Sequence, residues 1–179
     1  MSNFIINPYR FVAEAVNADW SIPSANWESP SAGQISKVGG VGSGTEVSTA
    51  QAAQDEAFVQ FTWKWVSGLS YTWVGISTLA YISGGSYDET SVNYGFQLNN
   101  TNSTVTAIVD GLGAGSTSHS VDVDTVFKLA YDGSDLTWLI DDVVKHTLTV
   151  DLSSAGLQYL FTNNNRYEGN TVTVSGTWG

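Results

Sequence analysis

The sequence predicts an all-β protein, a two-sheet antiparallel β-sandwich, on three observations. Apolar and polar residues alternate with period two through many short segments. Turns rich in Asp, Gly and Asn separate these segments, and no long stretch has the period of a helix. With 179 residues, the chain is long enough for one two-layer domain.

Residues 126–149 carry the pattern most clearly. Phe127, Leu129 and Tyr131 alternate with polar or small residues, and the same period continues after the turn at 132–134. A second turn at Asp141-Asp142 precedes another alternating run. Alternation bounded by Asp and Gly is typical of antiparallel strands with one buried face. This segment is therefore predicted to form three strands in succession.

The remaining strands are assigned by the same criteria. They are predicted at 57–65, 71–78, 92–98, 104–109, 157–161 and 171–177, with a hairpin of 34–38 and 45–49 around a glycine cluster. Loops are predicted around Gly111, Gly113 and Gly115 and at 163–166. Near the N-terminus, a strand is predicted at residues 4–6 and a helical turn at residues 11–17. We expect residues 1–33 to form an N-terminal strand with an extended docking segment, and 34–179 to form the sandwich.

Composition excludes several classes of protein. Seventeen acidic residues against six basic ones give a net charge of −11, which repels the phosphate backbone of nucleic acids. The absence of cysteine rules out disulfides and thiolate metal sites. The N-terminus lacks the basic and apolar regions of a secretory signal, and no apolar run has the length of a membrane span. No partnership with nucleic acid or membrane is expected.

Several segments together resemble the concanavalin A-like lectin/glucanase jelly roll, which includes laminin-G-like domains. The resemblance covers about residues 34–179 and rests on the segments FVQFTWKW, YTWVGIS, VNYGFQL, VFKLAYDGSDLTWLIDDVV and LQYLFTN, in that order. It implies a jelly roll, a fold in which binding domains and hydrolases both occur.

The segment INPYRF near the N-terminus resembles the opening of head- and tail-associated proteins of bacterial viruses. That resemblance implies a place on the virion surface, a homo-oligomer, and capsid or tail subunits as partners. In jelly rolls the first and last strands commonly lie side by side. By that resemblance, residues 4–6 would pair near 171–177, and residues 7–33 would dock on another subunit.

Hydrolysis of polysaccharides is not predicted. In the hydrolases that the sequence resembles, two carboxylates on one strand face one cleft, about 5–5.5 Å apart in retaining enzymes. Here Asp55-Glu56 and Asp88-Glu89 are adjacent pairs, and neighbouring strand residues point to opposite faces. The pair Asp122 and Asp124 has suitable spacing but reads as the solvated beginning of a strand. No catalytic residues are therefore predicted.

Metal sites and catalytic triads have little support. His119 is predicted in a Ser/Thr-rich loop and His146 on a strand, without the spacing of a zinc site or a nucleophile motif. Calcium could be held by Asp88, Glu89 and Asn93, or by Asp122 and Asp124, but neither set has a recognised calcium-binding spacing. No cofactor is predicted.

Glycan binding is the chemistry that the residues favour. Sugar sites combine an apolar platform with a few polar groups. If Val74 and Ile76 point inward, Tyr71 and Trp73 are exposed on a sheet face; the alternative places both rings in the core. The polar candidates on strands are Asn93, Gln97 and Lys128, and the candidates in surrounding loops are Tyr87, Asp88 and Arg166.

Together these features predict a non-enzymatic virion structural protein with a lectin-like jelly roll. It would decorate the head or tail of a bacterial virus and bind cell-surface glycans weakly, strengthened by multivalency. Two alternatives stay open: a purely structural, oligomeric capsid or tail component, and a polysaccharide-cleaving glycoside hydrolase of the same fold.

Overall fold

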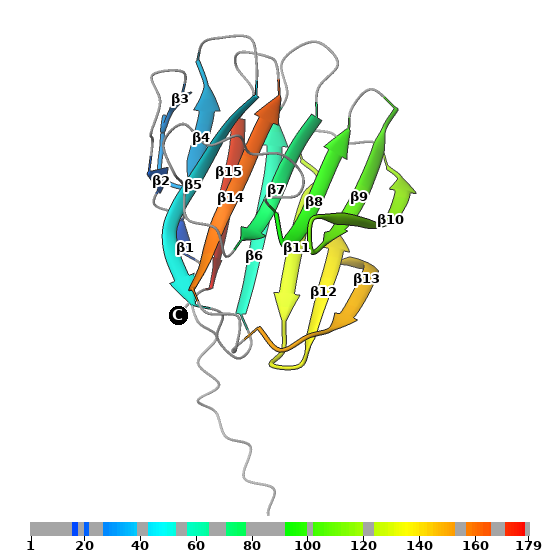
Figure 1. Ribbon diagram of the computed structural model, residues 1–179. Coiled ribbons are helices and arrows are strands. Elements are labelled where there is room, and N and C mark those ends of the chain that lie inside the picture. Colours follow the sequence, from blue (N-terminus) through cyan, green and yellow to red (C-terminus); the bar gives the residue numbers. More distant parts are fainter. Residues whose placement is uncertain are drawn as a thin grey trace, which may run out of the picture.

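The chain folds into two antiparallel β-sheets stacked face to face (Figure 1). The computed structural model describes residues 16–17, 20–21, 27–38, 43–52, 57–64, 71–77, 92–99, 102–119, 124–152, 157–165 and 171–177. The predicted all-β sandwich is confirmed. No helix in these ranges has the length and apolar character needed to cross a membrane.

The eight-stranded sheet, here called sheet A, contains the predicted meander at one edge. Its strands in spatial order are β13 (Val143–Thr149), β12 (Asp135–Ile140), β11 (Val126–Tyr131), β6 (Ala57–Lys64), β15 (Thr171–Thr177), β4 (Gln34–Lys37) and β3 (Trp27–Glu28), with β1 (Val16–Asn17) also paired to β15. The three strands predicted within 126–149 are therefore confirmed as β11, β12 and β13.

The seven-stranded sheet, here called sheet B, forms the other layer. Its strands in spatial order are β10 (Leu112–Ser118), β9 (Thr104–Val109), β8 (Tyr94–Asn99), β7 (Tyr71–Ser77), β14 (Leu157–Asn165), β5 (Ser43–Ala52) and β2 (Trp20–Ser21). The edge strand β10 lies on the same side of the sandwich as β13, the edge strand of sheet A (Figure 1).

Large apolar side chains fill the space between the sheets. Every second residue of β11, β12 and the middle of β6 points inward and is almost fully buried, against inward residues of β7, β8 and β9; the largest of them are Phe61, Trp63, Phe96, Phe127 and Trp138. Burying a side chain of this size contributes about 1.5–3 kcal/mol. The alternation seen in the sequence therefore sets which face of each strand is buried.

The turns of the meander are built by aspartates. Asp132 Oδ1 accepts hydrogen bonds from the backbone N–H groups of Ser134 at 3.0 Å and Asp135 at 2.7 Å. Between β12 and β13, Asp141 and Asp142 both have positive φ, 49° and 61°. Two consecutive residues in this region form the tight turn that suits the twist of a hairpin.

The predicted hairpin of 34–38 and 45–49 is wrong. β4 lies in sheet A beside β15 and β3, whereas β5 lies in sheet B beside β14 and β2. The chain thus passes from one sheet to the other between these strands. A glycine-rich turn is compatible with either connection, and only the longer pairing of β5 with β14 decides between them.

Two predicted loops are partly strands. Gly113 and Gly115 lie in β10, which pairs with β9, and residues 163–165 belong to β14, which pairs on both sides with β5 and β7. Gly and Asn are depleted in strands, so the sequence favoured loops. Neighbouring strands supply the backbone partners that override this weak preference.

The N-terminal part contributes three short strands. β1 pairs with β15, through Val16 opposite Gly176 and Asn17 opposite Ser175, so the predicted helical turn is wrong at these two residues. β2 pairs with β5, and β3 pairs with β4. The strand predicted at 4–6 lies outside the described residues.

Candidate functional site

The predicted sugar platform on β7 is not open to solvent. Val74 and Ile76 point into the core, which is the arrangement under which Trp73 was expected to be exposed. Trp73 does lie on the opposite face, but it is only 7% exposed. Gln97 lies directly beside Trp73 in the sheet and is half-buried. Only the backbone of Tyr71 is described. A ring so covered cannot stack on a sugar without rearrangement.

The outer face of sheet B is covered near Trp73 by other apolar side chains. Val92, just before β8, is fully buried, and its Cγ1 lies above the paired glycines Gly75 and Gly95. Ile108 on β9 is 2% exposed on the same outer face. Because the outer face of sheet B is also buried here, the residues on both faces of β7 are apolar.

Lys128 lies on the other side of the molecule from Gln97. It points away from the core on sheet A, and its Nζ lies 4.7 Å from the centroid of the Phe58 ring. Gln97 points away from the core on sheet B. The prediction that these two side chains belong to one site is therefore wrong, because the whole sandwich separates them.

The other predicted site residues are not gathered either. Asn93 is half-buried, and its backbone donates to Ile76 O at 3.1 Å and accepts from Asp110 N at 2.6 Å. Tyr87, Asp88 and Arg166 lie outside the described residues, as do Glu89 and Asp122 of the calcium candidates. Asp124 is exposed, and the described part of the chain holds no cluster of three or more His, Cys, Asp or Glu suited to a metal.

A cavity of about 220 Å³ opens between the two edge strands, β10 of sheet B and β13 of sheet A. We call it the edge cavity. Its floor is apolar and includes Phe96 and Trp138, which are almost completely buried. Its rim combines the exposed Val144 with the polar residues Thr117, Lys145 and His146. Ser116 also lines the cavity, but its side chain lies beside Thr106 on the outer face of sheet B. An apolar pocket with a few converging polar groups is the usual form of a binding site.

Two β-bulges shape this cavity. The pairing of β10 with β9 shifts between Gly113 and Gly115, and the pairing of β13 with β12 shifts at Lys145. Consecutive strand residues normally point to opposite faces. The extra residue in β13 allows both Lys145 and His146 to line the cavity. Bulges at sheet edges commonly redirect side chains in this way.

Trp138 holds the floor of the cavity in place. Its Nε1–H donates a 2.7 Å hydrogen bond across the core to the carbonyl oxygen of Gly95, which joins the two sheets. The His146 ring lies edge-on to Trp138, with 5.1 Å between the ring centroids. The orientation of His146 is therefore fixed by a side chain that is itself anchored to the opposite sheet.

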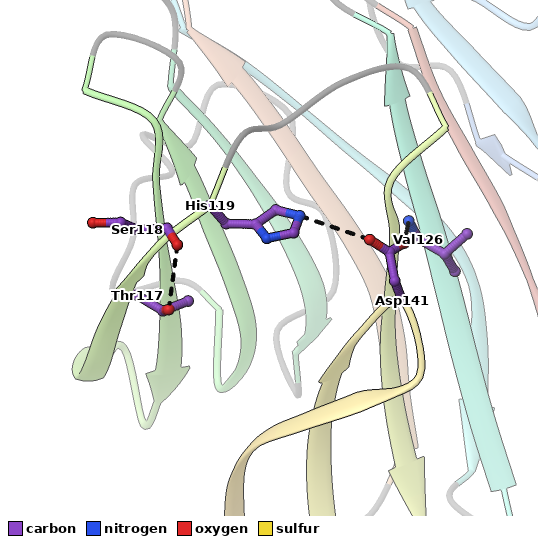
Figure 2. Close-up of polar contacts among 5 residues, drawn as sticks. All are labelled: Thr117, Ser118, His119, Val126 and Asp141. Atoms are coloured by element: carbon purple, nitrogen blue, oxygen red, sulfur yellow. Dashed lines mark hydrogen bonds and ion pairs between the residues drawn. The ribbon is translucent and has the colours of Figure 1, made fainter.

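A second link between the sheets joins the residues that follow β10 and β12 (Figure 2). His119 follows β10, and its Nε2 is 3.8 Å from Asp141 Oδ2 in the β12–β13 turn. Asp141 Oδ1 also accepts a 2.9 Å hydrogen bond from Val126 N. Beside them, the Thr117 hydroxyl is 3.5 Å from Ser118 O, too far to be held firmly.

Comparison with solved structures identifies the fold. A carbohydrate-binding module, CBM66 from Bacillus subtilis, has a TM-score of 0.51 and 12% identity, covering 89% of this chain and 94% of its own. The fold is the lectin-like jelly roll.

Two other jelly rolls are carbohydrate-recognition or glycan-bound domains. The metal-free Emp46p carbohydrate recognition domain has a TM-score of 0.58 and 13% identity, covering 84% of this chain and 87% of its own. The VIP36 exoplasmic/lumenal domain bound to Ca²⁺ and Man3GlcNAc has a TM-score of 0.57 and 11% identity, covering 90% of this chain and 86% of its own. No protein-family model matches this sequence, and a comparison with curated proteins found no relative.

The sequence interpretation missed the edge cavity of this jelly roll. It placed His119 and the preceding serines in a loop, although Ser116 and Thr117 lie in β10. The available signal was weak: Val143 and Val144 are consecutive apolar residues, which breaks the alternation of β13 next to the turn. Such a break is typical of a bulge, but it does not show which other strand lies opposite.

The described lining of the edge cavity offers hydrogen-bonding groups to a ligand. None of the described residues that line it is Asp or Glu, so these residues supply no pair of carboxylates for glycoside hydrolysis. Their polar side chains are the Thr117 hydroxyl, an ammonium group and an imidazole, which can hold hydrogen-bonding groups of a ligand.

Proposed function

We propose that this protein is a non-enzymatic, lectin-like glycan-binding protein on the surface of a bacterial virus particle, and that a single sugar unit enters the edge cavity. The observation that carries the proposal is the cavity itself, with an apolar floor and a polar rim at the edge of a lectin-like fold. Its volume of about 220 Å³ is below the about 300–1,000 Å³ typical of drug-sized ligands. One sugar ring is the matching size.

The structural relatives support the carbohydrate part of this proposal. CBM66 is described as a carbohydrate-binding module, and VIP36 was solved with a mannose-containing glycan. The shared fold by itself does not determine the ligand. The match between cavity chemistry and sugar chemistry supplies the second argument: Val144 can contact C–H groups, while Thr117 can bond hydroxyls.

The placement on a virion rests on the sequence. The INPYRF segment, the absence of cysteine and the abundance of Gly, Ser, Thr and Asn support it. Many copies on one particle would convert weak single-site binding into strong attachment. Mass spectrometry of purified particles, with limited proteolysis of free and assembled protein, tests this placement. Absence of the chain from particles would contradict it, and protection of residues 1–33 only in particles would support their docking role.

A glycan array with multivalent protein tests the binding function. Gly115 lines the cavity, and a Cβ added to it would meet no atom within 4 Å, so Gly115→Leu should fill the space without a clash. We expect this variant to lose the array signal. Thr147→Leu, which adds an apolar side chain to the exposed outer face of β13, should keep it.

Three outcomes would contradict the proposal in different ways. Absence of any glycan signal, together with a stable oligomer in solution, would favour the purely structural alternative. A signal unaffected by Gly115→Leu would place the sugar elsewhere on the molecule. Release of reducing sugar from host polysaccharide would revive the hydrolase alternative.

A further inference from the structure

The edge cavity is positively biased in a strongly acidic chain. The protein has seventeen acidic residues and six Lys or Arg. Yet the charged or chargeable side chains among the described lining residues are Lys145 and His146, with no carboxylate. The long-range field of the protein repels anions, but at physiological salt it is screened beyond about 8 Å. A ligand inside the cavity therefore responds mainly to these two side chains.

The polar groups of the rim donate more than they accept. An ammonium group is a donor only, and a neutral imidazole has one donor and one acceptor. The Ser116 hydroxyl lies outside the cavity, on the outer face of sheet B, where it shares a 2.7 Å hydrogen bond with Thr106 Oγ1. Neutral sugars present hydroxyls that must also donate, and carboxylate or amide oxygens are the side-chain groups best suited to accept. The side chains of the described lining residues include neither.

The acidic side chains of the β12–β13 turn do not line the edge cavity. Asp141 follows the lining residue Ile140, but its two carboxylate oxygens face Val126 N and His119. Asp142 is exposed in the same turn and does not line the cavity. Among the lining residues that the structure describes, no carboxylate is present to neutralise Lys145.

The bulge in β13 gives this arrangement its geometry. Lys145 is the extra residue, and His146 is held against Trp138. A flexible ammonium group next to an oriented ring can contact one small anionic group from two sides. Hydrogen bonds to charged groups are about twice as strong as neutral ones, so such a pair would discriminate between charged and neutral ligands.

We propose that the edge cavity recognises an acidic sugar, whose carboxylate lies between Lys145 and His146 while its ring contacts Val144 and the hydroxyl of Thr117. This inference rests on the proposed glycan-binding function and narrows it to one class of ligand. It concerns a site at the open edge between the two sheets, away from the residues first predicted from the sequence.

Titration calorimetry with matched sugar pairs tests the inference. The probes are trigalacturonate, a glucuronate-containing trisaccharide and sialyllactose, each beside its carboxyl-reduced counterpart. Short ligands limit repulsion by the net charge of −11. We expect at least one acidic member to bind about five-fold or more tightly than its reduced counterpart. Lys145→Gln should remove that difference.

Lys128→Gln is the matched control, since it makes the same charge change on the outer face of sheet A. It should leave the preference intact. Equal binding of acidic and reduced sugars, or a preference unchanged by Lys145→Gln, would overturn the inference while leaving glycan binding in place. Equally tight binding of triglutamate would show that charge alone is recognised and would also overturn it. Absence of binding by every sugar, acidic or neutral, would remove the proposed function with it.

Discussion

Single residues pack the outer face of sheet B and connect it to sheet A. Gly75 and Gly95 lie opposite each other, with Val92 packed over both on the outer face of sheet B. On the inner side, the carbonyl oxygen of Gly95 accepts the hydrogen bond from Trp138. Gly95 is thus in contact on both faces of sheet B. A larger residue at this position would disturb both the packing of Val92 and the hydrogen bond to Trp138.

We predict that Gly95→Ala destabilises the protein strongly, whereas Gly115→Ala does not. A Cβ on Gly95 would lie 2.8 Å from Gly75 Cα and 2.9 Å from Val92 Cγ1, and closer still to Val74 O. Overpacking of this kind costs about 3 kcal/mol at the upper end. A Cβ on Gly115 meets nothing within 4 Å, and Gly→Ala can then gain about 0.4–1 kcal/mol. Urea unfolding of both variants checks this; equal stabilities would contradict the geometry.

Asp132 makes the stability of the first meander turn depend on pH. Hydrogen bonds from Asp135, then Ser134, hold the pKa of this exposed carboxylate below its ordinary value of 3.8. A lowered pKa in the folded state contributes stability above pH 3.8, and that contribution is lost as pH falls through the folded-state pKa.

We therefore expect Asp132→Asn to lower the thermal midpoint at neutral pH, with the difference from wild type shrinking below about pH 4. Asn keeps an acceptor oxygen but has no charge. Thermal unfolding of both proteins between pH 2 and 7 measures this. A difference that is constant across the range would show that the carboxylate charge has no role in the turn.

At the scale of the element, the two edge strands carry the features that distinguish this sandwich. β10 and β13 each contain a bulge, and both flank the edge cavity. Their sequences are unlike those of central strands: β10 is rich in Gly and Ser, and β13 begins with two exposed valines. Edge strands with bulges and a lysine also resist pairing with other chains.

The β12–β13 turn offers a test at this scale. Asp142 has φ 61°, a conformation that costs a non-glycine residue roughly 1–2 kcal/mol. Asp142→Gly should therefore raise the free energy of unfolding by about 1 kcal/mol. Asp141→Gly should give no such gain, since it also removes the contacts to Val126 N and His119. Chemical denaturation compares the two; a larger gain from Asp141→Gly would contradict this assignment.

The whole molecule depends on strands that are far apart in the sequence. β15, near the C-terminus, lies between β6 and β4 and also pairs with β1. β14 lies between β7 and β5 in the other sheet. Most pairings outside the meander are therefore long-range, which predicts slow folding on the millisecond-to-second scale of other β-sandwiches.

Truncation from the N-terminus tests this organisation. Deletion of residues 1–28 removes β1, β2 and β3, which pair with β15, β5 and β4. We expect it to lower the free energy of unfolding by about 2–4 kcal/mol, from several hydrogen bonds of about 1 kcal/mol each. Deletion of residues 1–15 leaves all described strands and serves as the control. Equal stability of the 1–28 deletion and the full chain would mean that residues 29–179 fold independently of the first three described strands.

Local patterns in the chain were enough to predict the class of fold and the buried face of the central strands. Alternation is a local property, so Phe127, Leu129 and Trp138 could be placed inward without knowing what lay opposite. Which strands became neighbours, and which surfaces stayed open, was established only by the folded arrangement. It buried Trp73, put Lys128 and Gln97 on opposite sides, and brought Lys145 to face β10 across a cavity. Those outcomes depend on contacts between distant segments, which the period of a single strand does not encode.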